Sequence, residues 1–473
     1  MVHPPADPIA RASYDEAYAA PGVARPHYAA LLDALAEVDL AALRDGVNAR
    51  LHRAGVRFAT GEDDAFVVDP IPRIFTAAEW DALAAGLEQR VRALNAFVLD
   101  VYGPRRIVEA GHMAGEVIDS AEGYEPELRG RFPAVAAPIG VAGLDIVRAP
   151  DGTLTVLEDN VRTPSGFTYA LAARRAVRDA LPDGVPDPVA AGDEVFGLLG
   201  GVLSAAAPGT ADAPFAIVLT DGAGGGAAWE HAEVARKLGA PLVTCDDLVH
   251  RGERLEVRLE DGRRRAVDVV YRRTDEDGLR DARGAPTAVG AALLEPWLQG
   301  SVAVVNAFGT GVADDKLVHG HVREMIRFYL GEEPLAAAVP TLDLGRADDL
   351  EAVLGDLRGH VVKPRFGHGG AGVVVCAHAD DRTLERVRDQ LTAAPEGFVA
   401  QPLIAISSHP TVIGDGRLEP RHVDLRPFLF ATDVKMGFTP GGLTRVAWDA
   451  GALVVNSSQN GGAKDTWVLR PSR

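Results

Sequence analysis

The stretch Val361-Val362-Lys363-Pro364-Arg365-Phe366-Gly367-His368-Gly369-Gly370-Ala371-Gly372-Val373-Val374-Val375 places a lysine and four glycines between two apolar segments. Glycine lets a backbone approach a phosphate chain closely and turn its N–H groups inward, and the lysine adds a positive charge. Because the lysine precedes the glycines and no Gly-Lys-Ser/Thr closes the motif, this is not a Walker loop. The pattern predicts a phosphate-binding hairpin, and on this motif alone a plain tight turn is the alternative.

Oxygen ligands for a metal occur on a second predicted hairpin, residues 144–158. Two apolar segments flank the turn 149–152, which favours a β-hairpin. Asp145 would lie on one strand and Glu158 and Asn160 on the other, with Glu158 and Asn160 on one face. Magnesium uses such ligands together with substrate phosphates, so we predict a Mg²⁺ site here. Solvated surface acids are the alternative.

Three more segments complete a larger pattern. The second lysine, Lys316, opens a predicted helix, Gln401-Pro402-Leu403 ends a strand, and Asp424-Leu425-Arg426 forms an Asp-x-Arg motif. Together with the glycine-rich loop and Glu-x-Asn, these motifs resemble the ATP-grasp ligases. In most of those proteins the metal ligands come last. Here they come first, which resembles the circularly permuted type 2 ATP-grasp proteins, relatives of glutathionylspermidine synthase, from Gly22 to Leu469.

The resemblance implies ATP and Mg²⁺ as cofactors and assigns roles to matching positions. The phosphates would be held by Lys316 and Lys363. A flexible lid would consist of Gly367, His368, Gly369 and Gly370, within the loop that ends at Gly372. The adenine would be met by Gln401 and Leu403. Asp145, Glu158 and Asn160 would bind the metal. Arg426 and Arg445 would stabilise the phosphates or an acyl-phosphate.

Further arginines lie in segments that resemble the substrate side of the family. Arg162 and Ser165 directly follow the metal ligands, and Arg272 and Arg273 end a predicted strand. Arginine forks suit the carboxylates that such a ligase must orient, so we predict a catalytic role for Arg162 and substrate contacts for the other three residues. An exposed basic pair is the alternative for Arg272 and Arg273. We interpret the cluster Trp229-Glu230-His231 mainly as capping or packing its own helix. The resemblance implies, as an alternative, that it lines the substrate cleft.

The predicted fold combines α/β and α+β parts in several domains. It is a circularly permuted ATP-grasp fold with a Rossmann-like pre-ATP-grasp domain. Apolar residues at three- and four-residue spacing over 25–111 predict helices, and a strand, helix and strand over 215–244 predict a parallel sheet. We also expect a hairpin at 255–271 and strands at 360–362, 373–376, 398–400, 425–430 and 451–455. The expected parts are a helical N-terminal region (1–115), a metal-binding part (116–190), the Rossmann-like domain (191–312) and a nucleotide-binding part (313–473). Because residues near 145–160 must meet residues near 316–372 across one nucleotide, we expect a fold of high contact order.

Composition excludes several function classes. The 473 residues include 48 Lys and Arg against 67 Asp and Glu, a net charge of −19, which disfavours nucleic acid or an anionic membrane as partner. Cys245 and Cys376 lie far apart, so neither a disulfide framework nor structural zinc is indicated. No signal-peptide pattern or long uncharged apolar run occurs, so we expect a cytoplasmic protein.

The resulting hypothesis is an ATP- and Mg²⁺-dependent ligase that joins a small-molecule or peptide carboxylate to an amine through an acyl-phosphate. The substrates of glutathionylspermidine synthase cannot be assigned to this protein, because the amidase domain of that enzyme has no counterpart here. Two alternatives stay open. One is a non-catalytic nucleotide-binding scaffold with a partner protein from the same gene cluster. The other is an NAD-dependent oxidoreductase, suggested by the glycine-rich segment 221–227 followed by Asp246 and Asp247.

Overall fold

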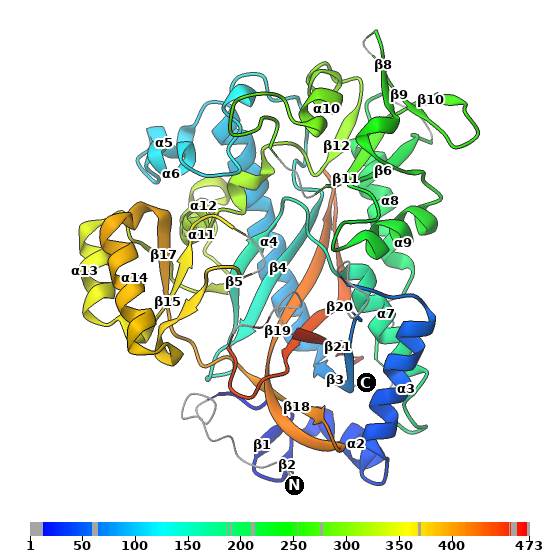
Figure 1. The fold of residues 1–473 in the computed structure, drawn as a ribbon, viewed down its shortest axis with the longest axis vertical. Coiled ribbons are helices and arrows are strands. Elements are labelled where there is room, and N and C mark those ends of the chain that lie inside the picture. Colours follow the sequence, from blue (N-terminus) through cyan, green and yellow to red (C-terminus); the bar gives the residue numbers. More distant parts are fainter. Residues whose placement is uncertain are drawn as a thin grey trace.

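The computed structural model describes residues 13–58, 65–186, 188–189, 192–209, 213–252, 254–274, 278–367, 370–453, 455 and 461–470. Its centre is an eight-stranded sheet with the order β13-β5-β4-β19-β20-β21-β3, in which β18 pairs with β19 (Figure 1). These strands are β3 (Val68–Phe75), β4 (Val141–Arg148), β5 (Leu154–Asn160), β13 (Ala337–Ala338), β18 (Ser408–Ile413), β19 (Arg417–Ala431), β20 (Met436–Ala447) and β21 (Gly461–Val468). The hairpin β4–β5 confirms the predicted one, and β4 pairs on its other side with β19, from near the other end of the chain.

A long helix, α4 (Ala77–Tyr102), crosses behind the central sheet (Figure 1). It starts at a capping box, in which Thr76 Oγ1 accepts from the Glu79 N–H and the Glu79 carboxylate accepts from the Thr76 N–H. Its buried Leu83, Leu87 and Val91 recur at four-residue spacing and pack into the main hydrophobic core. This face of the helix covers the strands that carry the predicted metal ligands.

The prediction of helices throughout residues 25–111 is wrong for one segment. Helices α2 (Pro26–Leu35), α3 (Leu40–Arg53), α4 and α5 (Arg106–Glu109) do form there. Between them, however, β3 pairs in parallel with β21 at the edge of the central sheet. Pro70 and Pro72 explain the difference, because proline is excluded from helix interiors and is tolerated in edge strands.

A four-stranded parallel sheet, with the order β12-β11-β6-β7, confirms the predicted strand, helix and strand unit. Its strands are β6 (Ala216–Thr220), β7 (Leu242–Val243), β11 (Val269–Arg273) and β12 (Ala303–Val305), with helices α8 (Glu194–Ala206), α9 (Ala228–Leu238) and α10 (Ala288–Leu298). The predicted hairpin over 255–271 is only partly right. Strands β8 (Leu248–Arg251), β9 (Arg254–Arg258) and β10 (Arg264–Ala266) form a separate antiparallel sheet, whereas Tyr271 lies on β11.

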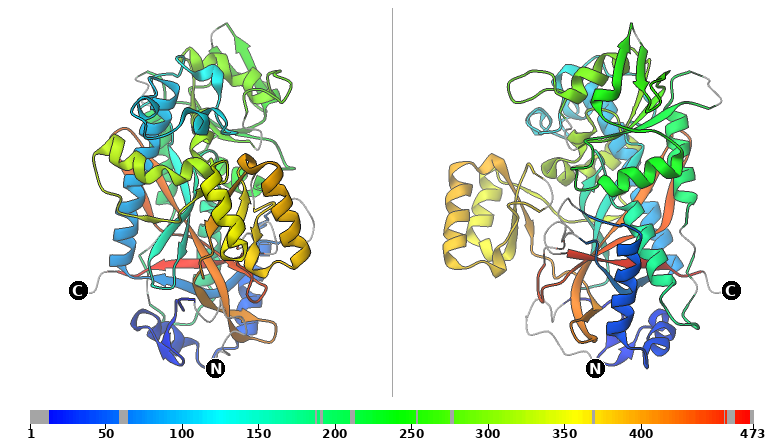
Figure 2. Two further views of the ribbon diagram at one scale, coloured as in Figure 1. Left: turned by 90° about the vertical axis from the view of Figure 1, so that its left-hand side faces the viewer. Right: turned by 45° about the vertical axis from the view of Figure 1, so that its right-hand side comes forward.

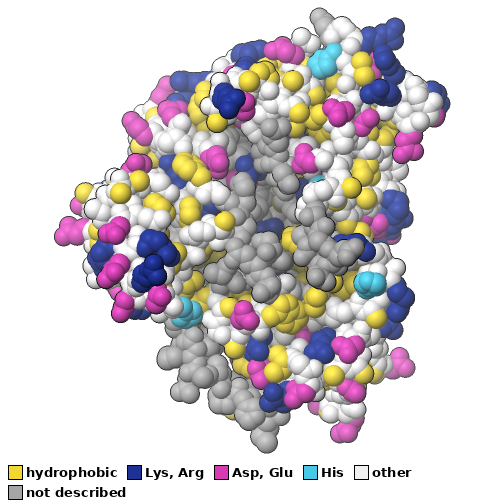
Figure 3. Space-filling view, viewed as in Figure 1, with side chains coloured by type: hydrophobic (Ala, Val, Ile, Leu, Met, Phe, Trp, Pro, Cys, Tyr) yellow, Lys and Arg dark blue, Asp and Glu magenta, His cyan; other side chains and the backbone are white. Residues whose placement is uncertain are grey.

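A smaller lobe projects from the body (Figure 2, right). Its antiparallel strands are β14 (Leu342–Asp343), β17 (Phe398–Pro402), β15 (His360–Pro364) and β16 (Val374–Val375), covered by α13 (Ala347–Gly355) and α14 (Asp381–Ala393). The lobe has its own hydrophobic core around Leu344, Val362 and Leu391. Acidic and basic side chains are mixed over its surface (Figure 3). The glycine-rich segment joins β15 to β16, as the sequence predicts.

The remaining α-helices and strands are β1 (Tyr18–Ala20), β2 (Val23–Ala24), α6 (Gly115–Asp119), α7 (Phe167–Arg178), α11 (Lys316–Gly320) and α12 (Val322–Met325). The predicted strand at 451–455 is wrong, since its described residues belong to no strand and Gly451 has a φ of 78°. Such a φ is typical of a turn. In the part of the chain that the structure describes, no helix has the length and apolar composition to cross a membrane.

Candidate active site

A cavity of about 680 Å³ lies where the central sheet, the small lobe and the parallel sheet meet. Most predicted site residues line it: Asp145, Glu158, Asn160, Arg162, Ser165, Arg273, Lys316, Lys363, Gly367, Gly370, Gln401, Leu403, Arg426 and Arg445. His368 and Gly369 lie outside the described residues. The cavity therefore gathers side chains from positions 145 to 445, and the individual roles of these residues stay predictions.

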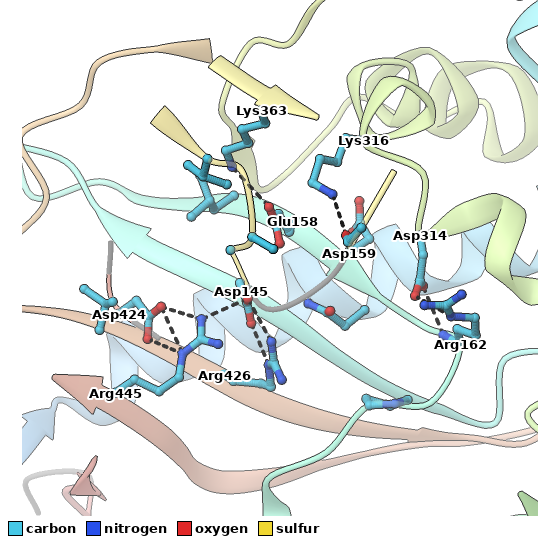
Figure 4. Close-up of a pocket in the computed structure, with 18 of the residues that line it drawn as sticks. Asp145, Glu158, Asp159, Arg162, Asp314, Lys316, Lys363, Asp424, Arg426 and Arg445 are labelled. Atoms are coloured by element: carbon cyan, nitrogen blue, oxygen red, sulfur yellow. Dashed lines mark hydrogen bonds and ion pairs between the residues drawn. The ribbon is translucent and has the colours of Figure 1, made fainter. Parts of the chain in front are cut away.

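Both predicted phosphate-binding lysines already contact oxygen acceptors. Lys363, on β15, places Nζ 3.1 Å from Glu158 Oε1, and Lys316, at the start of α11, donates from Nζ to the Gly367 carbonyl at 3.0 Å. The two lysines point into the same space from different elements (Figure 4). Phosphate oxygens would replace these acceptors. The Lys363–Glu158 ion pair thus joins the small lobe to the hairpin β4–β5 across the cavity.

A cluster of arginines and carboxylates forms the floor of the cavity (Figure 4). Arg426 binds Asp145 with two hydrogen bonds, of 2.6 and 2.9 Å, and Arg445 adds one of 2.9 Å. Arg445 also binds Asp424. Burial alone would raise the pKa of Asp145, but Arg426 and Arg445 outweigh it and lower the pKa to about 2. Asp145 is therefore ionised at neutral pH.

The predicted metal ligands fit a magnesium ion that shares its coordination with phosphate. Asp145 and Glu158 lie directly opposite each other on β4 and β5, and Asn160 lies two residues along β5. Burial raises the pKa of Glu158, but Lys363 outweighs it, so the net shift is downward. The Asn160 Nδ2 atom is buried without a hydrogen-bond partner in the described structure. Among the described residues no group of three His, Cys, Asp or Glu side chains could hold a metal, so phosphate or water oxygens would complete the shell.

Comparison with known proteins decides the family. Residues 72–447 match the family described as circularly permuted ATP-grasp type 2. The chain belongs to this family. The permuted order of the motifs is therefore confirmed, and membership implies that the protein binds ATP. This permuted ATP-grasp protein pairs β4, from its early hairpin, with the late strand β19.

Relatives and a solved structure agree with this assignment. The protein is 41% identical over 470 residues to an uncharacterized protein of Synechocystis, covering 97% of both chains. It is 43% identical over 469 residues to the Frankia alni protein named "Putative glutamate--cysteine ligase 2-3", covering 97% of this chain but only 54% of that one. It thus spans about half of the Frankia protein. The structure of a glutathione synthetase-like effector from Globodera pallida superposes with a TM-score of 0.58 at 11% identity, covering 92% of this chain and 98% of that one, which shows the fold alone.

The permuted ATP-grasp site contains a buried network that the sequence analysis missed. Asp159 lies between the metal-ligand positions but faces the opposite side of β5. Arg90, on α4, binds it with two hydrogen bonds of 2.6 Å, and His319 Nδ1, on α11, lies 2.7 Å from it. Burial raises the pKa of Asp159, but Arg90 outweighs it and lowers the pKa. The network connects β5, which carries two of the predicted metal ligands, to the helix that begins with Lys316.

Arg365 is a second residue that the sequence analysis missed, although it stands in the glycine-rich stretch. Its guanidinium binds Asp315 at 2.9 and 3.1 Å, Ser120 Oγ at 2.7 Å and the Val117 carbonyl at 2.6 Å. Asp315 caps α11 by accepting from the N–H groups of Leu317 and Val318. Arg365 therefore holds the N-terminus of α11, where Lys316 lies.

The arginines at the substrate side differ from one another. Arg272 and Arg273 are both buried, so the alternative of an exposed basic pair is wrong. Successive residues of a strand face opposite sides, and only Arg273 lines the cavity. Arg272 lies over the Phe308 ring at 5.4 Å, so the prediction that it contacts substrate is not supported. Arg162 lies 3.7 Å from Asp314, whose carboxylate also accepts from the Arg162 N–H.

Arg273 is held in place by Glu230, which lies on α9. The Glu230 carboxylate accepts from five donors: Ser165 Oγ, the Gly166 N–H, the Thr168 N–H, Thr168 Oγ1 and Arg273 Nη2. It thereby caps the N-terminus of α7 rather than that of its own helix, α9, which has no side-chain cap. Arg273 also donates to the Pro164 carbonyl at 2.7 Å and to Ser165 Oγ at 2.6 Å. Its fork therefore orders the loop 162–166.

The segment 221–227, which suggested an oxidoreductase, follows β6 and leads into α9 as the dinucleotide pattern requires. Asp247, one of its two predicted acidic partners, instead accepts from the Thr244 N–H at 3.0 Å within its own turn. Gly226 and Ala227 line the same cavity as the two lysines. In this ATP-grasp protein the end of the segment therefore borders the same cavity as Lys316 and Lys363.

Proposed function

We propose that this protein is an ATP- and Mg²⁺-dependent ligase that joins a carboxylate to an amine through an acyl-phosphate. One observation carries the proposal: two lysines, the Asp145-Glu158-Asn160 set and two arginines meet in a single cavity, although they come from distant parts of the chain. Family membership supports the use of ATP. The glutamate–cysteine ligase name of the Frankia relatives agrees with carboxylate–amine chemistry, but about half of each relative lies outside the match, so its substrates are not carried over.

In the proposed reaction, a carboxylate oxygen of the acid substrate attacks the γ-phosphorus of ATP, and the bond to ADP breaks. The amine then attacks the acyl carbon and phosphate leaves, while the amine loses a proton. Lys316 and Lys363 would hold the phosphates, and Arg426 and Arg445 would neutralise charge on the transferred group. Mg²⁺ held by Asp145, Glu158 and Asn160 would neutralise further phosphate charge.

The Lys363–Glu158 ion pair gives this proposal a specific binding behaviour. Phosphate oxygens would draw Lys363 away from Glu158, whose side chain is 31% exposed, and this would weaken the ion pair of that carboxylate. Mg²⁺ would supply positive charge in its place. ATP and Mg²⁺ should therefore bind together, and each alone should bind weakly.

The test is calorimetric titration of the purified protein with a non-hydrolysable ATP analogue, with and without Mg²⁺, and with NAD as control ligand. The variants are Lys363→Ala and Glu158→Ala, with exposed Lys435→Ala as the matched control. We expect Mg²⁺-dependent binding that both site variants lose and the control retains. Pairs of carboxylates and amines are then screened for ADP release. Binding of NAD instead of ATP would favour the oxidoreductase, and ATP binding without ADP release from any pair would favour the scaffold.

A further inference from the structure

The segment between β12 and α11, residues 306–315, bonds to the hairpin that carries the predicted metal ligands. Its first residue, Asn306, is 2% exposed and does not line the cavity. The side-chain oxygen, Oδ1, accepts from the N–H groups of Gly140 and Val141 at 2.9 and 2.8 Å. The Nδ2 atom donates to the carbonyls of Val141 and Val161 at 2.7 and 2.6 Å, with a longer contact of 3.4 Å to the Arg162 carbonyl. These bonds use the donors and acceptor positions of the carboxamide, so its orientation is fixed.

Asn306 bonds to the hairpin at the point where the pairing of β4 with β5 ends. The last paired residues are Gly143, on β4, and Asn160, on β5. Val141 precedes Gly143 and Val161 follows Asn160, so both lie just beyond the paired part of the hairpin. By bonding to both of them, Asn306 joins the ends of two strands that no longer bond to each other. One of these ends carries a predicted metal ligand.

Asp314 holds the same backbone through its N–H groups. Its Oδ1 atom accepts from the Val161 N–H at 2.6 Å and from the Arg162 N–H at 3.0 Å (Figure 4). Val161 is therefore bonded through its N–H to Asp314 and through its carbonyl to Asn306. Both partners belong to the segment 306–315, so the backbone at Val161 cannot shift relative to this segment without breaking these bonds.

The position of the Asn160 carboxamide depends on this backbone. Its Nδ2 atom is buried without a hydrogen-bond partner in the described structure, so no bond to that atom sets the direction of the side chain. At the other end of the segment, Lys316 opens α11 only two positions after Asp314. The segment thus holds a predicted metal ligand and a predicted phosphate ligand in a fixed relation to each other.

We propose that Asn306 and Asp314 are positioning residues, which together clamp the backbone at Val161 and so hold Asn160 as a ligand for the metal that accompanies ATP. This inference rests on the proposed ligase function. Replacement of residues that orient a metal ligand typically weakens metal affinity about 10–100-fold. Loss of this clamp should therefore weaken Mg²⁺ binding, whereas loss of a purely structural contact would lower only the stability of the fold.

The test compares two substitutions of Asp314. Asp314→Asn keeps an oxygen that can accept from the two N–H groups, whereas Asp314→Ala removes it. Asp268→Ala is the control, because Asp268 also accepts from a distant backbone N–H, that of Phe215 at 2.7 Å, but does not line the cavity. The non-hydrolysable ATP analogue is titrated into each variant at a series of free Mg²⁺ concentrations, which gives the apparent Mg²⁺ affinity. Urea unfolding without ligand gives the stability.

We expect Asp314→Ala to weaken the apparent Mg²⁺ affinity about tenfold or more and Asp314→Asn to retain most of it. Asn306→Asp should also weaken it, because a carboxylate oxygen would then face the carbonyls of Val141 and Val161. Asp268→Ala should lower only the stability. An unchanged Mg²⁺ affinity in Asp314→Ala or Asn306→Asp, equal losses in both Asp314 variants, or an equal loss in the control would overturn the clamp. Absence of Mg²⁺-dependent analogue binding by the wild-type protein would instead refute the ligase proposal, and the clamp with it.

Discussion

Replacement of Asp159 by asparagine removes a negative charge from the most enclosed ion pair near the candidate site. The Arg90 and Asp159 side chains are 1% and 0% exposed, and two hydrogen bonds of 2.6 Å join them. Asparagine keeps the shape but leaves the Arg90 guanidinium buried without a counter-charge. Loss of one partner of such a pair costs about 3–5 kcal/mol. We expect the free energy of unfolding to fall by that amount.

The assay is urea unfolding followed by circular dichroism, with Asp381→Asn as the matched control. Asp381 pairs with Arg358 at 2.8 Å, but both side chains are exposed, so this substitution should cost less than about 1 kcal/mol. The double variant Arg90→Met/Asp159→Leu should recover part of the loss, because it removes both charges. Equal effects of Asp159→Asn and Asp381→Asn would refute the reasoning, since burial would then have no influence on the pair.

Three further predictions concern the site, pH dependence and packing. Arg426→Lys should lower the rate of ADP release about 100-fold, because lysine cannot reproduce the two-point contact with Asp145; an unchanged rate would exclude Arg426 from the reaction. Burial raises the pKa of Glu125 to about 7 from 4.5, so its stabilising contribution is present below pH 4.5 and is lost as the pH rises through 7. Glu125→Gln should therefore raise the melting temperature at pH 8 but not at pH 4, and equal shifts at both would contradict this pKa. Gly123→Ala should destabilise the protein by about 1–3 kcal/mol, because its Cβ would lie 2.3 Å from the Gly311 backbone. Gly197 is exposed on α8 with open space around it, so Gly197→Ala should stabilise the protein by about 0.5–1 kcal/mol. Thermal melting of the two variants checks both signs.

Local sequence signals predicted the parts of the site that form between neighbouring residues. The hairpin that carries Asp145 and Glu158 and the segment that carries Lys363 are recognisable because strand, turn and glycine patterns act over a few positions. The order of the motifs along the chain also indicated the permuted family. These features depend on residue type and spacing, which are readable along the chain.

Contacts between distant residues were decided by tertiary structure alone. Strand β3 has a partner, β21, almost 400 positions later, and nothing local to either segment specifies that pairing. In the sequence, nothing distinguishes Asp159 and Glu230 from other acidic residues. The structure shows that they form ion pairs with Arg90 and Arg273, respectively. Similarly, Arg272 and Arg273 have the same local sequence context, yet one lies over Phe308 and the other lines the cavity. Burial, ion pairing and the direction of a side chain depend on what packs against it. The sequence therefore indicated the family and many of the helices and strands, whereas packing decided which charges meet.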